Sequence, residues 1–168
     1  IATSTVNVTR PAPAKLELTR TPLLPNPAIV GEATKVCLQV KNVGESAGDY
    51  VLTDNPTALL TPASEPRFSG SLAPGASREH CYDARTTAGP NAKADLNATL
   101  ASPVQPDLTA QTPFERVNLL LRKSTDTPVV RPGREARFAI VVTNPLKRPV
   151  IADLRGTTEL VLTPDENQ

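Results

Sequence analysis

Hydrophobic and polar residues alternate along much of this 168-residue chain, with a period of two. In residues 36–40 the apolar side chains are Val36, Leu38 and Val40, and residues 92–102 alternate in the same way over a longer stretch. A period of two is typical of a β-strand that buries one face and exposes the other. Turn signals rich in Pro, Gly and Asn separate these stretches, so the pattern predicts short antiparallel strands in an all-β protein.

One segment of the chain recurs 102 residues later without gaps. Residues 30–42, VGEATKVCLQVKN, align with residues 132–144, PGREARFAIVVTN. In each copy a glycine opens an alternating strand and an asparagine, Asn42 or Asn144, closes it. A short apolar strand precedes each copy at an offset of 102 or 103, and a strand with an Asp near its end follows. The repeat predicts that the chain holds more than one structural unit.

Turn signals and proline-rich stretches divide the chain into these units. We interpret residues 1–13 as the closing strand of a preceding unit with a proline linker, and residues 14–104 as one complete unit. Residues 105–113 are expected to be a second linker, and residues 114–168 the truncated first half of another unit. Short proline-rich segments favour extended backbone, so the linkers should act as semi-rigid spacers.

The ends of this sequence need not be domain boundaries. The chain contains no Met and opens on Ile1, so we expect a processed product or a piece of a longer protein. The secondary structure of residues 113–122 can be a helix or a strand, because Pro113 is suited to the first position of a helix. The equivalent residues of the first copy, 13–19, alternate as a strand, and a strand is therefore favoured here too.

The motifs at the strand ends resemble those of a known domain family. A strand that ends in VKNVG at residues 40–44 is followed by a strand with an Asp near its end and then by GSLAPG at residues 70–75. In this order the chain is similar to CARDB-type and related "conserved repeat" immunoglobulin-like domains of bacterial and archaeal envelope proteins. The resemblance covers residues 16–102 and part of 119–153. It departs from the family at Asn144, where the loop is shorter and lacks its glycine.

This resemblance implies a fold and a setting. It implies a seven-stranded β-sandwich that is repeated in tandem within large secreted, cell-wall or surface-layer proteins. Turns every 8 to 12 residues and about 90 residues per unit suit such a sandwich. The expected fold class is therefore all-β, with tandem immunoglobulin-like antiparallel β-sandwich domains. The expected location is extracytoplasmic, in the bacterial cell envelope or on the cell surface.

The two cysteines, Cys37 and Cys81, are the candidate site residues. Both belong to the outward set of their strands, and the strand order implied by the resemblance makes these strands neighbours. Matching parity on adjacent strands brings Cβ atoms to about 4.5–5.5 Å, within reach of a disulfide. Such a disulfide indicates an oxidising compartment. The alternatives are two unpaired thiols in a cytosolic protein or a metal site, although two Cys and one His are fewer than the ligands of structural zinc.

Catalytic motifs are missing from the sequence. The only histidine, His80, adjoins Cys81, and adjacent strand residues point to opposite faces, so the two cannot work as base and nucleophile. No nucleophile elbow, phosphate loop, dinucleotide fingerprint or CxxC motif is present. The carboxylates are too scattered for a calcium loop. We therefore expect no enzyme, no catalytic residues, no cofactor and no metal site.

Charge and composition exclude further classes of function. The 18 Lys and Arg balance 17 Asp and Glu without a basic cluster, which argues against nucleic-acid binding. No apolar run approaches the roughly 18 residues of a membrane span. The sequence therefore predicts a non-catalytic rigid spacer and self-assembly element whose partners are neighbouring copies or other envelope proteins. An adhesin or carbohydrate-binding accessory domain is the alternative, although only five aromatic residues are available for a sugar platform.

Overall fold

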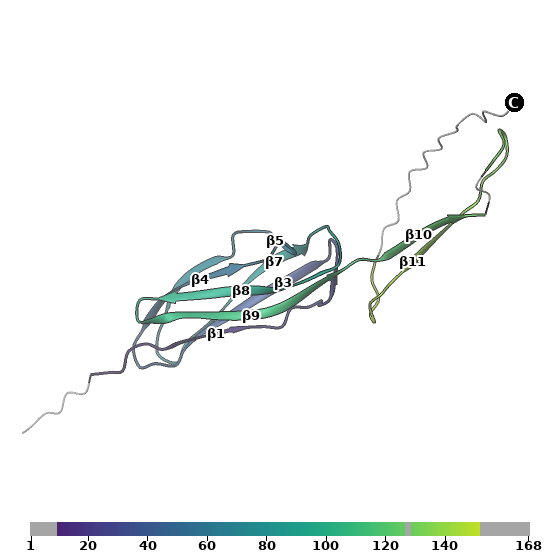
Figure 1. The fold of residues 1–168 in the computed structure, drawn as a ribbon. Coiled ribbons are helices and arrows are strands. Elements are labelled where there is room, and N and C mark those ends of the chain that lie inside the picture. The colour runs from purple at the N-terminus through teal and green to yellow at the C-terminus, as the bar shows by residue number, and fades with distance from the viewer. Residues whose placement is uncertain (1–9, 127–128, 152–168) are drawn as a thin grey trace, which may run out of the picture.

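Two β-sheets pack face to face, and a separate hairpin extends from one end of this sandwich (Figure 1). The structure is a computed structural model, and it describes residues 10–126 and 129–151. The closing strand predicted within residues 1–9 and the end of the second unit at residues 152–168 lie outside these ranges. No helix within the described ranges is long and apolar enough to cross a membrane.

The first sheet has four antiparallel strands in the order β1-β3-β7-β5. Their bounds are Leu16–Arg20 for β1, Ala33–Asn42 for β3, Ser77–Thr86 for β7 and Leu60–Pro62 for β5. Strand β3 alternates along its whole length, whereas β7 alternates only from Cys81 onward, after three exposed residues. The inward-facing residues of β7, His80, Tyr82 and Ala84, are half-buried or buried. Strands β3 and β7 are neighbours, as the family resemblance implied.

The second sheet has five strands in the order β2-β9-β8-β4-β6. Their bounds are Ala28–Ile29 for β2, Gln105–Val117 for β9, Ala92–Ser102 for β8, Gly48–Asn55 for β4 and Arg67–Leu72 for β6. Only the short pairing of β2 with β9 is parallel. Within the described ranges the sandwich thus has nine strands instead of the implied seven, because β2 and β5 are short additions.

The hydrophobic core between the two sheets consists of two clusters of buried residues, and Phe68 packs against both. The fully buried side chains come from both sheets, and the largest are Phe114, Leu38, Leu52, Leu96 and Leu100. Burying each side chain of this size contributes about 1.5–3 kcal/mol. The alternation that predicted the strands is therefore also the arrangement that stabilises them.

Residues 105–113 do not form the predicted linker, since they make up most of β9 and pair with β8. Phe114, which the sequence predicts to lie in the second unit, is only 1% exposed and packs in the sandwich core. The prolines in this segment suggest a linker, but each lies where a strand can accept it. Pro106 lies where the β8–β9 register shifts. Pro113 faces an open side of β9, because β2 pairs with β9 only beyond it. Proline is tolerated at such irregularities and on open strand sides. The first unit therefore extends to Val117.

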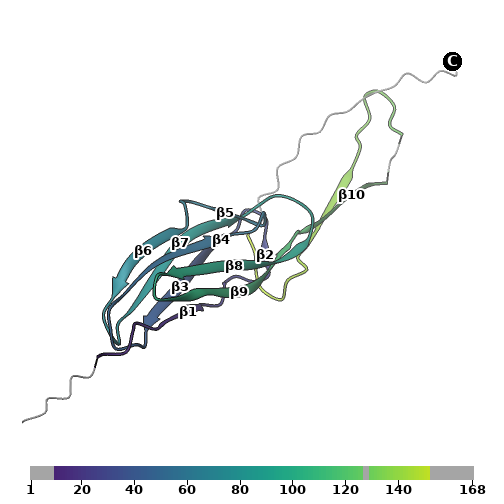
Figure 2. The ribbon, with the colours of Figure 1, turned by 60° about the vertical axis from the view of Figure 1, so that its left-hand side comes forward.

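The hairpin consists of β10, Leu120–Thr125, and β11, Phe138–Thr143. Residues 113–122 therefore form the end of β9, a two-residue connection and the start of β10, and contain no helix. In both views the hairpin continues beyond the end of the sandwich at which β9 leaves (Figure 2). Its residues are exposed except Thr125. The apolar side chains of the hairpin accordingly have no second sheet against them among the described residues.

Candidate functional site

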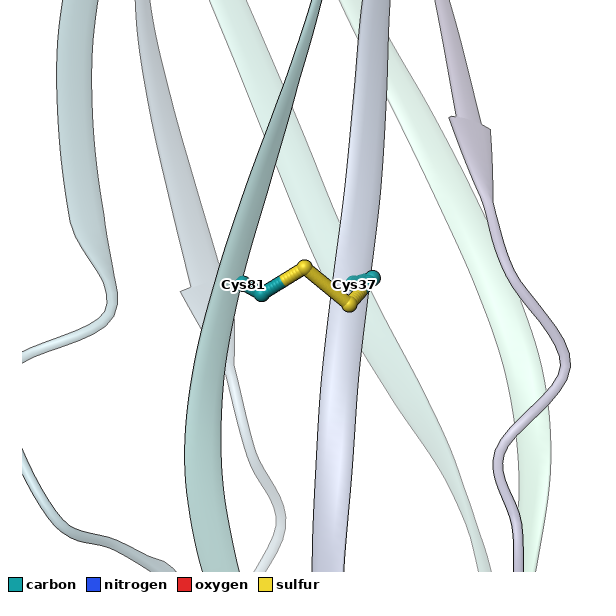
Figure 3. Close-up of a disulfide and its surroundings, with 2 residues drawn as sticks. All are labelled: Cys37 and Cys81. Atoms are coloured by element: carbon teal, nitrogen blue, oxygen red, sulfur yellow. A yellow bond between two sulfur atoms is a disulfide. The ribbon is translucent and has the colours of Figure 1, made fainter.

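Cys37 and Cys81 form a disulfide on the outer face of the four-stranded sheet (Figure 3). The two residues are directly opposite each other in the β3–β7 register, with Cα atoms 4.2 Å apart. Both are half-buried, whereas Val36 and Leu38 on the inner face of β3 are buried. The bond therefore links two strands of one sheet and does not cross the core.

Glu79 lies beside this disulfide on the same face of β7. Its carboxylate and the two sulfurs lie within 4.8 Å of one another, the one such grouping of potential metal ligands in the described part of the chain. A cysteine binds metal as a thiolate, and both sulfurs are committed to the disulfide. In this redox state the group has the chemistry of a covalent crosslink and not of a metal centre.

His80 points into the sandwich, away from the disulfide. Its Nε2 is 2.8 Å from the hydroxyl of Tyr50, and its ring stacks on Phe68 with centroids 4.7 Å apart. Burial lowers the pKa of His80, and the nearby positive charge of Arg78 lowers it further. The neutral imidazole thus connects β7 of the first sheet to β4 and β6 of the second. Its role here is packing between sheets.

A buried ion pair joins the two sheets. Both Nη atoms of Arg20, on β1, donate to the carboxylate of Asp54, on β4, at 2.8 and 2.5 Å. The two side chains are 1% and 0% exposed. The hydroxyl of Tyr82 also donates to Asp54, at 2.8 Å, and burial together with this carboxylate raises the pKa of Tyr82. The phenol therefore stays protonated and donates to Oδ2 of Asp54. Both carboxylate oxygens accept a hydrogen bond from Arg20, and Oδ2 accepts this second one from Tyr82.

Strand alternation alone does not predict this ion pair, although the sequence contains a signal for it. Arg20 continues the inward parity of Leu16 and Leu18, and Asp54 continues that of Leu52. Two opposite charges on inward positions of strands in facing sheets predict a buried pair, since an unpaired buried charge is too costly.

Asn42 organises the loop that follows β3. Its Nδ2 donates to the carbonyls of Ser46 and Leu72 at 2.8 and 2.9 Å, and its Oδ1 accepts the N–H of Gly44 at 2.9 Å. Asn42 is fully buried, and both the nitrogen and the oxygen of its side-chain amide make hydrogen bonds. Gly44 is required because a Cβ there would lie 2.4 Å from the backbone nitrogen of Lys15.

Asn144 makes the matching contacts in the second copy. Its Nδ2 donates to the carbonyl of Arg148 at 2.7 Å, and its Oδ1 accepts the N–H of Leu146 at 2.9 Å. These partners are each 102 residues from Ser46 and Gly44. The sequence departs from the family motif at this loop, yet the two asparagine contacts recur because they are made with backbone groups and do not need the glycine.

The end of the sandwich next to the hairpin is held by side chains of β9 and the connection after it. The guanidinium of Arg116 donates to the carbonyls of Thr87, Ala88 and Pro90 in the β7–β8 turn. One residue beyond β9, Asn118 donates from Nδ2 to the carbonyl of Gly89 at 2.8 Å. Only Asn118 and Leu119 separate β9 from β10.

Arg148 makes a second contact across this junction. Its Nη1 and Nη2 donate to the two carboxylate oxygens of Glu32 at 2.8 and 2.6 Å, and Nη2 also donates to the carbonyl of Pro27 at 3.0 Å. Hydrogen bonding to Arg148 lowers the pKa of Glu32, and the same contact raises the pKa of Arg148. The loop after β11 is thereby attached to the turn before β3, 116 residues earlier in the chain.

Comparisons with known proteins bear on the fold. No family model matches this sequence, and no curated protein matches it. Among solved structures, trypsin-activated α2-macroglobulin from Escherichia coli matches with a TM-score of 0.51 at 17% identity, over 70% of this chain and 8% of that one. A CARDB domain from Pyrococcus furiosus in complex with di-metal ions matches with a TM-score of 0.46 at 16% identity, over 67% of this chain and 99% of that domain.

The macroglobulin match shows a shared immunoglobulin-like β-fold. At this identity the likeness concerns the fold alone, and the chain corresponds to a small part of the macroglobulin's length. The described residues bring the two predicted site residues together and add three groups that the sequence analysis missed. These are the buried Arg20–Asp54 pair, the two asparagine-anchored loops and the Arg148–Glu32 contact.

Proposed function

We propose that this chain is a non-catalytic structural module of a bacterial cell-envelope or surface-layer protein. In this proposal tandem immunoglobulin-like units form a rigid spacer and a self-assembly element, and their partners are neighbouring copies or other envelope proteins. Function then resides in shape, stiffness and exposed strand edges.

The observation that carries this proposal is that the hairpin repeats the β1–β3 pair of the sandwich. Leu18 pairs with Val40 in the β1–β3 register, and Leu121 pairs with Val142 in the β10–β11 register. These pairs are related by the repeat offsets of 103 and 102 residues. The hairpin therefore has the strand pairing expected for the start of a second unit, joined to the first by a two-residue connection.

The free edge of β11 supports the assembly part of the proposal. In the sandwich, β3 pairs with β1 on one side and with β7 on the other, whereas β11 pairs only with β10 among the described residues. Exposed apolar side chains lie on this hairpin, including Ile140 at 43% exposure. Among the described residues this edge and its apolar face are uncovered, and such an edge is a typical site for strand addition, either by the remaining strands of the same unit or by another chain.

The disulfide and the aromatic residues support the remaining parts. A disulfide persists in oxidising compartments, which favours an extracytoplasmic location. Tyr50, Tyr82 and Phe114 are buried in the sandwich, and Phe68 packs against its core. Of the aromatic side chains only Phe138 is exposed, and it lies on the hairpin. A sugar-binding module needs exposed aromatic platforms, so the adhesin alternative receives no support from this surface.

The proposal is tested by self-association of the chain at high concentration, followed by sedimentation and electron microscopy, with a glycan array in parallel. Ordered fibres or sheets without glycan binding are expected. Ile140→Lys should abolish assembly, while the matched control Val104→Lys, at an exposed turn of the sandwich, should not. A chain that stays monomeric and binds a glycan strongly would overturn the proposal.

A further inference from the structure

The loop after β3 and the loop after β11 are built in the same way but carry different side chains. Asn42 and Asn144 each fix a loop in the same way. The side-chain amide of the asparagine donates a hydrogen bond to the backbone carbonyl of the residue four positions later. That fourth residue is Ser46 in the first copy and Arg148 in the second. The asparagine thus fixes the backbone at this position, so that its side chain has a defined place. The two copies differ in which side chain stands there.

In the first copy this loop contacts the segment that enters the unit. The carboxylate of Glu45 accepts the backbone N–H of Ala12 at 2.9 Å, and the hydroxyl of Ser46 donates to the carbonyl of Ala12 at 2.7 Å. In the second copy the loop contacts the preceding unit itself, through Arg148. In both copies the loop is therefore directed toward whatever comes before the unit in the chain.

The acceptor of Arg148 is also held in place. The Oε2 atom of Glu32 accepts the backbone N–H of Ile29 at 3.0 Å, so this carboxylate is oriented by its own turn before Arg148 binds. A guanidinium that meets a carboxylate through two parallel hydrogen bonds restricts angle as well as distance. The bond from Arg148 to the carbonyl of Pro27 adds a third point of contact.

The junction has a second, separate attachment. The backbone N–H of Asn118 donates to Oδ1 of Asn91 at 2.8 Å, and its side-chain Nδ2 donates to the carbonyl of Gly89 at 2.8 Å. One attachment lies in the connection after β9 and the other in the loop after β11. A single contact would leave rotation about the connection free, whereas two contacts from different segments remove it.

We infer that the asparagine-anchored loop is the surface by which each unit docks on the unit before it, and that the Arg148–Glu32 pair sets the angle between successive units. The partner of this surface is the strand-opening turn of a preceding immunoglobulin-like unit of the same polypeptide. The inference rests on the tandem arrangement proposed above. It adds that the stiffness of the spacer depends on a specific ion pair and not on the shortness of the connection alone.

Residual dipolar couplings of backbone amides in the isotopically labelled 168-residue chain test this inference. In the unmodified chain the couplings of β3 and β11 should fit one alignment tensor. In Arg148→Ala the couplings of β3 and β11 should require two different alignment tensors, and the tensor of the hairpin should have the smaller magnitude. Arg148→Lys keeps the charge but loses the two-pronged geometry, and should give an intermediate result.

Lys147→Ala is the matched control. Lys147 is exposed, adjoins Arg148 and makes no ion pair with any residue in the described ranges. The control should retain the single tensor. One tensor in Arg148→Ala, or equal effects of the two alanine variants, would overturn the inference.

Cross-strand nuclear Overhauser effects between Leu121 and Val142 report separately on the hairpin. If these are present in the unmodified chain while the hairpin already has its own tensor, the docking inference fails and the tandem proposal stands. If they are absent, the hairpin does not form and both fail.

Discussion

The β1–β3 pair of the sandwich and the β10–β11 hairpin have equivalent pairings but opposite environments. Leu38 is completely buried, whereas its equivalent Ile140 is 43% exposed. The partner of Leu38 in β1 is Arg20, and the partner of Ile140 in β10 is Lys123. The local sequence therefore decides which residues pair, while burial depends on the second sheet that packs against the pair.

The two pairs also differ at the positions that hold the sandwich together. Lys123 lies over the ring of Phe138 at 4.7 Å, where Arg20 instead meets a buried carboxylate. Ala139 stands where the first copy has Cys37. Each difference predicts a measurable contrast between matched variants.

The largest contrast is expected between Arg20→Ala and Lys123→Ala. Removing Arg20 leaves the Asp54 carboxylate buried without its counter-ion, which should lower the free energy of unfolding by about 3–5 kcal/mol. Removing the exposed Lys123 costs at most a cation–π contact of about 0.5–1 kcal/mol. Urea unfolding of both variants measures this, and similar losses would show that the buried pair is not a particular source of stability.

The disulfide should give the next largest effect. The Cys37→Ala, Cys81→Ala double variant removes a crosslink that the hairpin lacks, at an expected cost of about 2–4 kcal/mol to the sandwich. Thermal unfolding with and without reductant checks this, and intact mass should show a gain of two hydrogens on reduction of the unmodified chain. A mass that does not change on reduction would contradict the crosslink.

The paired loops predict a smaller contrast. Asn42→Ala leaves buried backbone groups without partners and should cost about 1–3 kcal/mol. Asn144 is exposed, so water can replace its contacts, and Asn144→Ala should change stability by no more than about 0.5 kcal/mol. Equal losses in differential scanning calorimetry would mean that the second loop is packed as tightly as the first.

The smallest effect concerns pH and belongs to the sandwich alone, since His80 is the only histidine. Its pKa is lower in the folded than in the unfolded state, so unfolded chains bind more protons in this range. Stability from neutral His80 is present above its unfolded pKa of about 6.5 and is lost as the pH falls toward the folded value. Unfolding in urea at pH 7 and pH 5 should show this loss, and His80→Gln should reduce it. An imidazole that titrates at its ordinary value by NMR would refute the argument.

Much of the sandwich could be predicted because its strands obey a simple alternation. The parity of Cys37 and Cys81 depends only on which neighbours are apolar, and the repeat offset carried the pairing of β10 with β11. The linker prediction for residues 105–113 failed because prolines signal a turn or linker wherever they occur. In β9 they occupy a register shift and an open side, and no sequence pattern distinguishes that context.

The buried ion pair was missed for a different reason. Charged residues normally lie at the surface, so the charges of Arg20 and Asp54 predict exposed positions although their parity places them on the inner face. The Arg148–Glu32 contact joins residues 116 positions apart, and only the three-dimensional course of the chain brings them together. Contacts of this kind depend on how the hairpin lies against the sandwich, which alternation does not encode.

The central claim, that β10 and β11 begin a second unit equivalent to the first, can be tested by completing that unit. A chimaera would join residues 1–144 to a second copy of residues 43–117, with the grafted cysteine replaced by alanine. If the hairpin is equivalent to β1 and β3, its amides should become as slow in hydrogen exchange as those of β3. Hairpin amides that exchange as fast as in the parent chain, while the first sandwich stays protected, would contradict the claim.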